Sequence, residues 1–140
     1  MNYRDYTLDT LQKLGLHRIF RGCEYIACGI EYLYSMDKWK TPESNIIYYF
    51  IADNFFLEPE AVENSIRNVL LRIWSSKENP ILMQTIFGSY NLDQKPCNLE
   101  FLILLYNYVR QNLEETETLR KLDTVWHHSK LTYLEKQKRS

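Results

Sequence analysis

The sequence lacks any apolar run long enough to cross a membrane. Its longest apolar stretch, LEFLILLYNYV at residues 99–109, is about half the length that a membrane-spanning helix needs. The first residues, MNYRDYTLD, are polar and charged and do not resemble a signal peptide. We therefore expect a cytoplasmic protein that has no membrane partner.

Cysteine is scarce, and its three copies, Cys23, Cys28 and Cys97, are odd in number. Cys23 and Cys28 are five residues apart and would not share one face of a helix. A reducing cytosol does not favour disulfides. No Cys-x-x-Cys or paired Cys/His spacing is typical of a zinc site. We predict no disulfide, no metal and no other cofactor.

Motifs for catalysis are missing too. The sequence has no Ser/His/Asp set, no glycine-rich phosphate loop and no paired carboxylates in a predicted pocket. Its histidines, His17, His127 and His128, lack the spacing of a metal site, and surface positions account for them. We expect no enzymatic activity.

An excess of basic charge is also missing. The chain has 17 Lys and Arg residues against 18 Asp and Glu residues, which gives a formal net charge of −1. Nucleic-acid-binding domains usually carry a basic footprint, so the overall charge counts against DNA binding. A local basic patch could still serve, because affinity depends on the face that contacts the phosphates.

What the sequence does contain is helical periodicity. Its 140 residues, 45% apolar and 25% charged, suit one folded domain with a core of its own. We find no strand pattern and no internal repeat. The sequence therefore predicts an all-α fold: a bundle of about six helices with a helix-turn-helix in residues 1–110, then a C-terminal helical extension in residues 111–140.

Capping residues and apolar spacing predict the positions of the helices before and after residues 46–74. The first helix is predicted at Thr7–Leu14, with Leu8, Leu11 and Leu14 inward and Gly15 as its terminator. The second runs from about Cys23 to Trp39, with Ile26, Ile30, Leu33 and Tyr34 on one side. A short helix starts at Asn79–Pro80 and closes at Gly88. Asn98 caps the last core helix, Leu99 to about Arg110, which is apolar nearly all round.

Residues 46–74 are the segment around which the chain is organised: two helices with a very short break between them. Residues 41–43, Thr-Pro-Glu, predict the start of the first helix, which carries Ala52. The second opens at Pro59, a residue favoured in a first helical turn. Its apolar side chains form one stripe at helical spacing: Val62, Ile66, Val69, Leu70 and Ile73.

A small residue such as Ala52 lets two helices cross closely. The resulting layout is that of a helix-turn-helix, whose second helix can enter a DNA major groove. An ordinary helical corner in an all-α core is the alternative. Trp74 and Phe87 are most simply core residues.

From Gln111 onward the sequence is polar, with Leu119, Leu122, Trp126 and Tyr133 at near-helical intervals. This extension is either an amphipathic helix laid on the body or a helix that binds a partner. The final residues, EKQKRS, are expected to fray.

Read together, these pieces resemble a known family, the C-terminal effector domain of the stage-zero sporulation master regulator of spore-forming Firmicutes. Four segments carry the resemblance: GLHRIFRGCEYIACGI at 15–30, IADNFFLEPEAVENSIRNVLLRIW at 51–74, NPILMQTIFG at 79–88 and KPCNLEF at 95–101. The resemblance implies a helix-turn-helix domain that binds short operator boxes, commonly in pairs, and regulates transcription. Only a few residues precede the first helix, so we expect no receiver domain ahead of it.

The chain departs from the family pattern on the surface that should contact DNA. The family's recognition helix presents Ser-Arg-Val-Glu-Arg-Ala-Ile-Arg-His, and this chain has EAVENSIRN at residues 60–68. Ala61 and Asn64 replace two groove-facing arginines, the usual bidentate partners of guanine. The family's operator specificity should therefore not be transferred to this chain.

On an ideal helix five residues project away from the apolar stripe: Glu60, Asn64, Arg67, Asn68 and Leu71. Asn64 and Asn68 could pair with adenine edges, and Arg67 could pair with guanine or a phosphate. The alternative is a solvated face on which Arg67 pairs with Glu63. By the resemblance, Arg21 stands where the family has a basic residue and could contact a phosphate. The predicted DNA-binding residues are Arg21, Glu60, Glu63, Asn64, Arg67 and Asn68.

We therefore expect a sequence-specific DNA-binding transcription regulator whose recognition helix is residues 59–74. Double-stranded DNA is its expected partner, and homodimerisation, perhaps through residues 111–140, would supply the second half-site. The alternative is a protein-interaction module or antagonist that keeps the fold, does not bind DNA and contacts another regulator protein. Near-neutral charge and the replaced arginines favour this alternative, and the matching Glu63 and Arg67 favour DNA binding.

Overall fold

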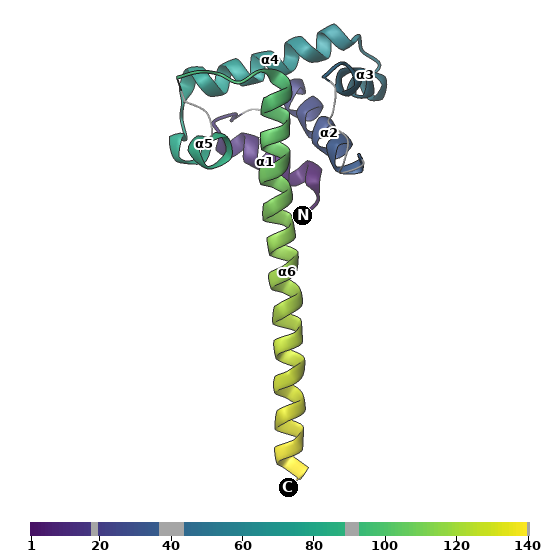
Figure 1. The fold of residues 1–140 in the computed structure, drawn as a ribbon, viewed down its shortest axis with the longest axis vertical. Helices are drawn as coiled ribbons and strands as arrows, with labels where there is room; N and C mark the ends of the chain where they lie inside the picture. The colour runs from purple at the N-terminus through teal and green to yellow at the C-terminus, as the bar shows by residue number, and fades with distance from the viewer. Residues whose placement is uncertain (18–19, 37–43, 89–92, 140) are drawn as a thin grey trace.

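A computed structural model describes residues 1–17, 20–36, 44–88 and 93–139, with the backbone alone for residues 44–45 and 123–139. In this part of the chain there are six α-helices and no strand, as the sequence predicts. The helices are α1 (Tyr3–Lys13), α2 (Arg21–Ser35), α3 (Ser44–Phe55), α4 (Pro59–Ser76), α5 (Pro80–Phe87) and α6 (Asn98–Arg139). Five of them surround the start of α6, and the rest of α6 projects away (Figure 1).

Helix α1 begins four residues before its predicted start at Thr7, because polar groups stabilise an earlier turn. The Asn2 side chain accepts a hydrogen bond from the backbone N–H of Asp5 at 2.7 Å, which caps the helix. Thr7 and Thr10 are buried, and their hydroxyls donate to carbonyls one turn back. Gly15 has φ +113°, a left-handed conformation that suits glycine and ends the helix as predicted.

Helix α2 lies at the centre of the body and packs against α1, α3, α4 and α6. Ile26, Ile30 and Leu33 are buried, as predicted. The prediction for Tyr34 is wrong: its side chain is 59% exposed, and its ring stacks on that of Tyr3 with centroids 4.3 Å apart.

The ends of α2 also differ from the prediction. The helix starts at Arg21 rather than Cys23, because Gly22 belongs to its first turn and not to a linker. It ends at Ser35, before the predicted end at Trp39. Trp39 and the predicted cap at residues 41–43 lie outside the described residues.

The core next to α4 is aromatic. Trp74 on α4, Phe87 on α5 and Phe101 on α6 have ring centroids 5.0 to 6.4 Å apart. All three are buried, which confirms the core positions predicted for Trp74 and Phe87. These rings join the three helices, so aromatic packing supports the buried side of α4.

Helix α5 follows an asparagine cap, as predicted. The cap predicted at Asn98 is wrong, because Asn98 is the first residue of α6 and its side chain donates to the Glu63 carbonyl. The Asn79 side chain accepts a hydrogen bond from the backbone N–H of Leu82 at 3.1 Å, and α5 follows. Helix α6 begins at Asn98, and its apolar residues at 101, 102, 105 and 109 are fully buried. This confirms the central position predicted for the helix.

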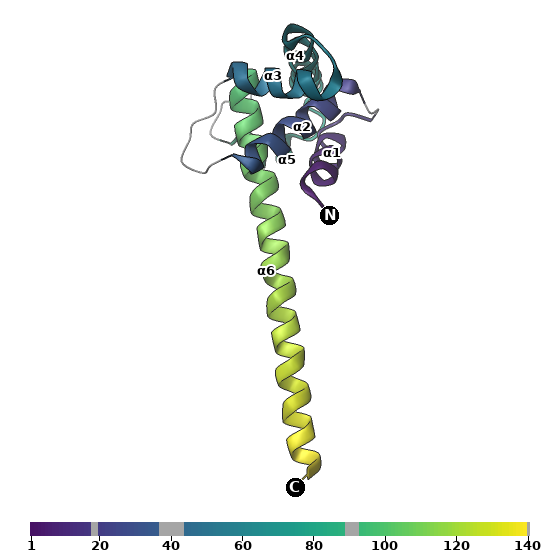
Figure 2. The same cartoon turned by 90° about the vertical axis from the view of Figure 1, so that its right-hand side faces the viewer.

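The predicted end of that helix near Arg110 is wrong, because α6 continues without a break to Arg139. Its C-terminal part stands away from the other helices in both views (Figures 1 and 2). The extension is therefore not laid on the body. No change of element marks the predicted division between residues 110 and 111, and that division stays a prediction. The side chains of Trp126, His127, His128 and Tyr133 lie outside the description.

Candidate nucleic-acid interface

A three-residue turn, Phe56 to Glu58, joins α3 to α4. The backbone N–H of Leu57 donates to the carbonyl of Ala52 at 3.0 Å, which closes the end of α3. Ala52 is buried, and Val62 and Ile66 on α4 are buried at the same corner. The predicted helix-turn-helix is therefore present.

Helix α4 has one buried and one exposed side. Its five predicted apolar-stripe residues are all buried. Its opposite side, here called the outward face of α4, is exposed; it comprises Glu60, Ala61, Asn64, Arg67, Asn68 and Leu71. Leu71 is 44% exposed, as predicted from the helical wheel. Helix α4 lies at the end of the body opposite to the projecting part of α6 (Figures 1 and 2).

Arg67 is paired within its own helix. Its guanidinium donates to Glu63 Oε1 at 2.8 Å and to Asn64 Oδ1 at 3.1 Å. Both carboxylate and guanidinium are partly exposed, so this pair contributes only about 0.3–0.5 kcal/mol. Arg67 can therefore exchange these partners for a ligand at little cost.

Glu63 lies at the border between the outward face and the core. Its backbone carbonyl accepts a hydrogen bond from the Asn98 side chain at 3.1 Å, which joins the start of α6 to α4. Tyr48 on α3 is buried near the same point. Burial raises the pKa of Tyr48, and a hydrogen bond with Asn98 offsets only part of this rise. Asn98 thus joins α6 to both α3 and α4, and these contacts fix the orientation of α4.

Arg21 is brought to α4 by the close approach of two helices. A Cβ atom added to its neighbour Gly22 would lie 2.7 Å from Val69 Cγ2 and 2.8 Å from the backbone carbonyl oxygen of Ser65. The first turn of α2 therefore touches the middle of α4, which only glycine permits. Arg21 itself is exposed. It thus lies beside α4, as a phosphate contact requires.

Arg72 belongs to the same surface, although the sequence analysis does not single it out. Its guanidinium carbon lies 4.2 Å from the centroid of the Phe20 ring, in a cation–π contact. Phe20 is the N-cap of α2 and precedes Arg21. The only signal in the sequence is the position of Arg72 one turn after Asn68 on the exposed side of α4.

Charge is unevenly distributed around α4. Asp53, Glu58 and Glu60 are exposed near its N-terminal end. Arg67 and Arg72 lie further along, with Arg21 at the adjoining end of α2. The N-terminal end therefore repels phosphates, and the C-terminal half attracts them.

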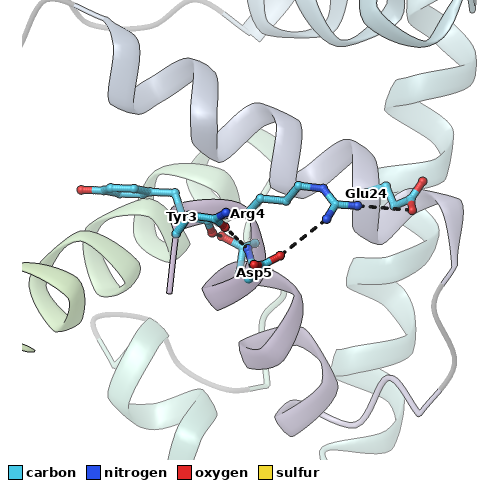
Figure 3. Close-up of polar contacts among 6 residues, drawn as sticks. Tyr3, Arg4, Asp5 and Glu24 are labelled. Atoms are coloured by element: carbon cyan, nitrogen blue, oxygen red, sulfur yellow. Dashed lines mark hydrogen bonds and ion pairs between the residues drawn. The ribbon is translucent and has the colours of Figure 1, made fainter.

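Not every arginine of the body belongs to this surface. Arg4 on α1 has guanidinium nitrogens 3.6 Å from Asp5 and 3.7 Å from Glu24, and it bridges α1 to α2 (Figure 3). Its charge is balanced by two carboxylates. Arg4 therefore serves as a control when the charges beside α4 are tested.

The chain matches the family described as "Sporulation initiation factor Spo0A C terminal" over residues 7–109. The chain belongs to this family. The family is the DNA-binding effector domain of a sporulation transcription regulator, and the chain is accordingly a DNA-binding transcription-regulator domain. No curated protein and no solved structure matches it.

Membership of the Spo0A C-terminal family decides between the two functions that the sequence leaves open. It supports DNA binding and transcription regulation with double-stranded DNA as a partner, and it does not favour the interaction module or antagonist. The family is a regulatory one and not a family of enzymes. The resemblance from which these expectations start is confirmed.

Among the described residues, no three His, Cys, Asp or Glu side chains gather in one place where they could hold a metal. Cys23 is buried, Cys28 is half-buried and Cys97 is exposed, and all three are free thiols. His17 is exposed, as predicted, with its Nε2 atom 2.6 Å from Glu78 Oε1. In the described part of the chain, no helix combines the length and the apolar character needed to cross a membrane.

Proposed function

We propose that the chain binds DNA by placing the outward face of α4 in the major groove. The observation that carries this proposal is the division of α4: Val62, Ile66 and Leu70 are fully buried, and the polar residues opposite them are exposed. A recognition helix needs both features, because it must be held firmly from behind while its side chains reach the bases.

The base contacts in this proposal come from the middle of α4. Asn64 and Asn68 are exposed one turn apart, and an asparagine amide can pair with both N6 and N7 of adenine. Arg67 leaves its partners and contacts guanine or a phosphate. Glu60 and Glu63 can accept from the N4 amino group of cytosine. The preferred site therefore includes adenines at the positions that face the asparagines.

The phosphate contacts come from Arg21 and Arg72. The Phe20 ring holds the Arg72 guanidinium by one face, which leaves its edge free to donate hydrogen bonds. Phosphate contacts of this kind set the register and orientation of the helix and carry no sequence information. Because the acids lie at the N-terminal end of α4, we expect its C-terminal half to lie closer to the DNA backbone.

The proposal includes two further features. The chain acts by binding and not by catalysis, and it works as a homodimer, so that a second copy supplies a second α4 for a second half-site.

Salt-dependent binding of a mixed-sequence DNA duplex tests the proposal. Fluorescence anisotropy with a labelled duplex should show binding at 50 mM NaCl that weakens strongly toward 200 mM, because phosphate contacts release counterions. Arg21→Ala and Arg72→Ala should each weaken binding and reduce the salt slope by about one. A selection from random duplexes then gives the preferred site.

Arg4→Ala is the matched control, since it removes the same charge from α1, where two carboxylates balance it (Figure 3). It should leave both affinity and salt slope unchanged. Absence of binding at 50 mM NaCl would contradict the proposal. So would an equal loss of affinity in Arg4→Ala and Arg21→Ala.

A further inference from the structure

The C-terminal part of α6 projects from the other five helices. Among the described side chains of α6, Leu113 is the last apolar one that packs against the core, and those of residues 114–122 are all exposed. Thr116, Glu117 and Arg120 border a shallow pocket with the start of α1, on another side of the helix from Leu119 and Leu122. The helix nevertheless continues to Arg139. Residues 114–139 therefore span about 39 Å at 1.5 Å per residue, and most of this length projects from the body (Figures 1 and 2).

This projecting segment carries an apolar seam. Leu119 and Leu122 are 66% and 60% exposed, three residues apart on one side of the helix. In the sequence, Trp126 and Tyr133 continue the spacing at intervals of four and seven residues. Apolar residues with this alternation form the narrow contact line of a two-stranded coiled coil. A lone helix of this composition is marginal in water, so a partner helix would stabilise it.

Charge along the segment identifies the partner. Residues 111–119 contain Glu114, Glu115 and Glu117 and no Lys or Arg. Residues 130–139 contain the opposite charge, with Lys130, Lys136, Lys138 and Arg139 against Glu135 alone. A second copy of the same helix running in the opposite direction places each acidic stretch beside a basic one. A parallel copy would place like charges side by side, which is unfavourable.

We propose that residues 114–139 of two copies pair as an antiparallel coiled coil. The pairing aligns residues 114–117 of one copy with the basic end of the other, and it buries the seam that begins at Leu119. Its centre lies near residue 126. The two bodies then lie at opposite ends of a rod, outside the paired segment.

This arrangement has a consequence for DNA recognition that rests on the proposed function. Helix α4 contacts the start of α6 through Asn98. In the antiparallel pair the two Asn98 residues lie on the order of 80 Å apart, at 1.5 Å per residue. One turn of DNA spans about 34–36 Å, so the two half-sites are separated by more than two turns. Self-association itself does not depend on DNA and can fail or succeed separately.

The mass of the full chain in solution tests the pairing without DNA. Light scattering after size-exclusion chromatography should give the dimer mass at about 100 μM. Leu122→Lys should raise the dimer dissociation constant at least roughly tenfold, because a charge enters the seam. Ile81→Lys is the control: Ile81 is 80% exposed on α5, and the same substitution there should leave the dimer intact. A monomer mass for the unmodified chain, or a dimer unaffected by Leu122→Lys, would overturn the proposal.

Distances between spin labels test the orientation. Gln111→Cys and Thr118→Cys, each in a Cys28→Ser, Cys97→Ser background, place one label per copy at exposed positions seven residues apart. In an antiparallel pair the label–label distance is about 21 Å longer at 111 than at 118, since each residue adds 1.5 Å in both copies. In a parallel pair the two distances are equal, and that result would overturn the antiparallel assignment.

Discussion

At the residue scale, Gly22 determines how the DNA-facing surface is assembled. It lies in the first turn of α2, against Val69 and the Ser65 carbonyl of α4. Any side chain there would push the end of α2, and with it Arg21, away from α4. The sequence shows a glycine at this position but not its partner, because the contact joins residues that are more than 40 positions apart.

Gly22→Ala should lower the free energy of unfolding by about 1–2 kcal/mol, because the added Cβ overlaps a backbone oxygen that cannot move alone. Gly29→Ala, in the same helix, is the control. Its added Cβ would meet side-chain atoms alone, Ile51 Cδ1 at 3.3 Å, Leu102 Cδ2 at 3.6 Å and Ile47 Cγ2 at 3.8 Å. The gain in helix propensity of up to about 1 kcal/mol offsets this crowding. Urea unfolding of both variants measures the difference. Equal effects would show that α2 and α4 are not held at this distance.

Cys28 should make stability depend on pH above 9. Burial, with a smaller effect from Glu31, raises the pKa of Cys28 from 9.0 to about 11. Between these values the unfolded chain loses the thiol proton and the folded chain keeps it, so stability is complete below pH 9 and falls as pH rises toward 11.

Urea unfolding at pH 8 and pH 10 in reducing buffer measures this fall. Cys28→Ala should show a smaller fall than the unmodified chain, and Cys97→Ala, at an exposed position, should show the same fall. Identical pH dependence in all three proteins would contradict the assignment to Cys28.

At the element scale, the turn between α3 and α4 contains a strained residue. Phe56 has φ 56°, a left-handed conformation unusual for a bulky side chain, and it is 94% exposed. Its side chain therefore makes almost no contact that would offset the strain. The turn keeps its geometry because the helices on both sides are anchored in the core.

Phe56→Asn should raise the free energy of unfolding by about 0.5–1 kcal/mol, because asparagine tolerates the left-handed region. Phe55→Asn is the contrast: the Phe55 ring packs edge-on against Tyr25 at 4.9 Å between centroids, and its loss should destabilise the fold. Thermal unfolding distinguishes the two. A loss of stability in Phe56→Asn would contradict the view that Phe56 is strained and free of contacts.

Local signals predicted most of the elements. The apolar stripe of α4, its proline start and the asparagine cap of α5 can be predicted from the sequence, because they depend on neighbouring residues. The start of α1 differs from the prediction because the Asn2 cap adds a turn before the apolar stripe begins at Leu8. The length of α6 was missed because its exposed half has no core contacts to give it a continuous stripe.

At the scale of the whole molecule, the chain separates two surfaces. Helix α4 lies at one end of the body, and the projecting part of α6 leaves from the other (Figure 1). The helical wheel predicted which residues of α4 face outward. It could not predict that Arg72 stacks on Phe20, because that contact depends on how α2 crosses α4. The role of the six predicted residues in DNA binding stays a prediction.

The central claim is that this chain meets DNA with α4 and the adjoining end of α2. Amide chemical-shift changes on addition of a selected DNA duplex test it most directly. We expect the largest changes at residues 60–72 and 20–22, and little change in α1 and α5. Changes centred on residues 111–122, with α4 unaffected, would contradict it.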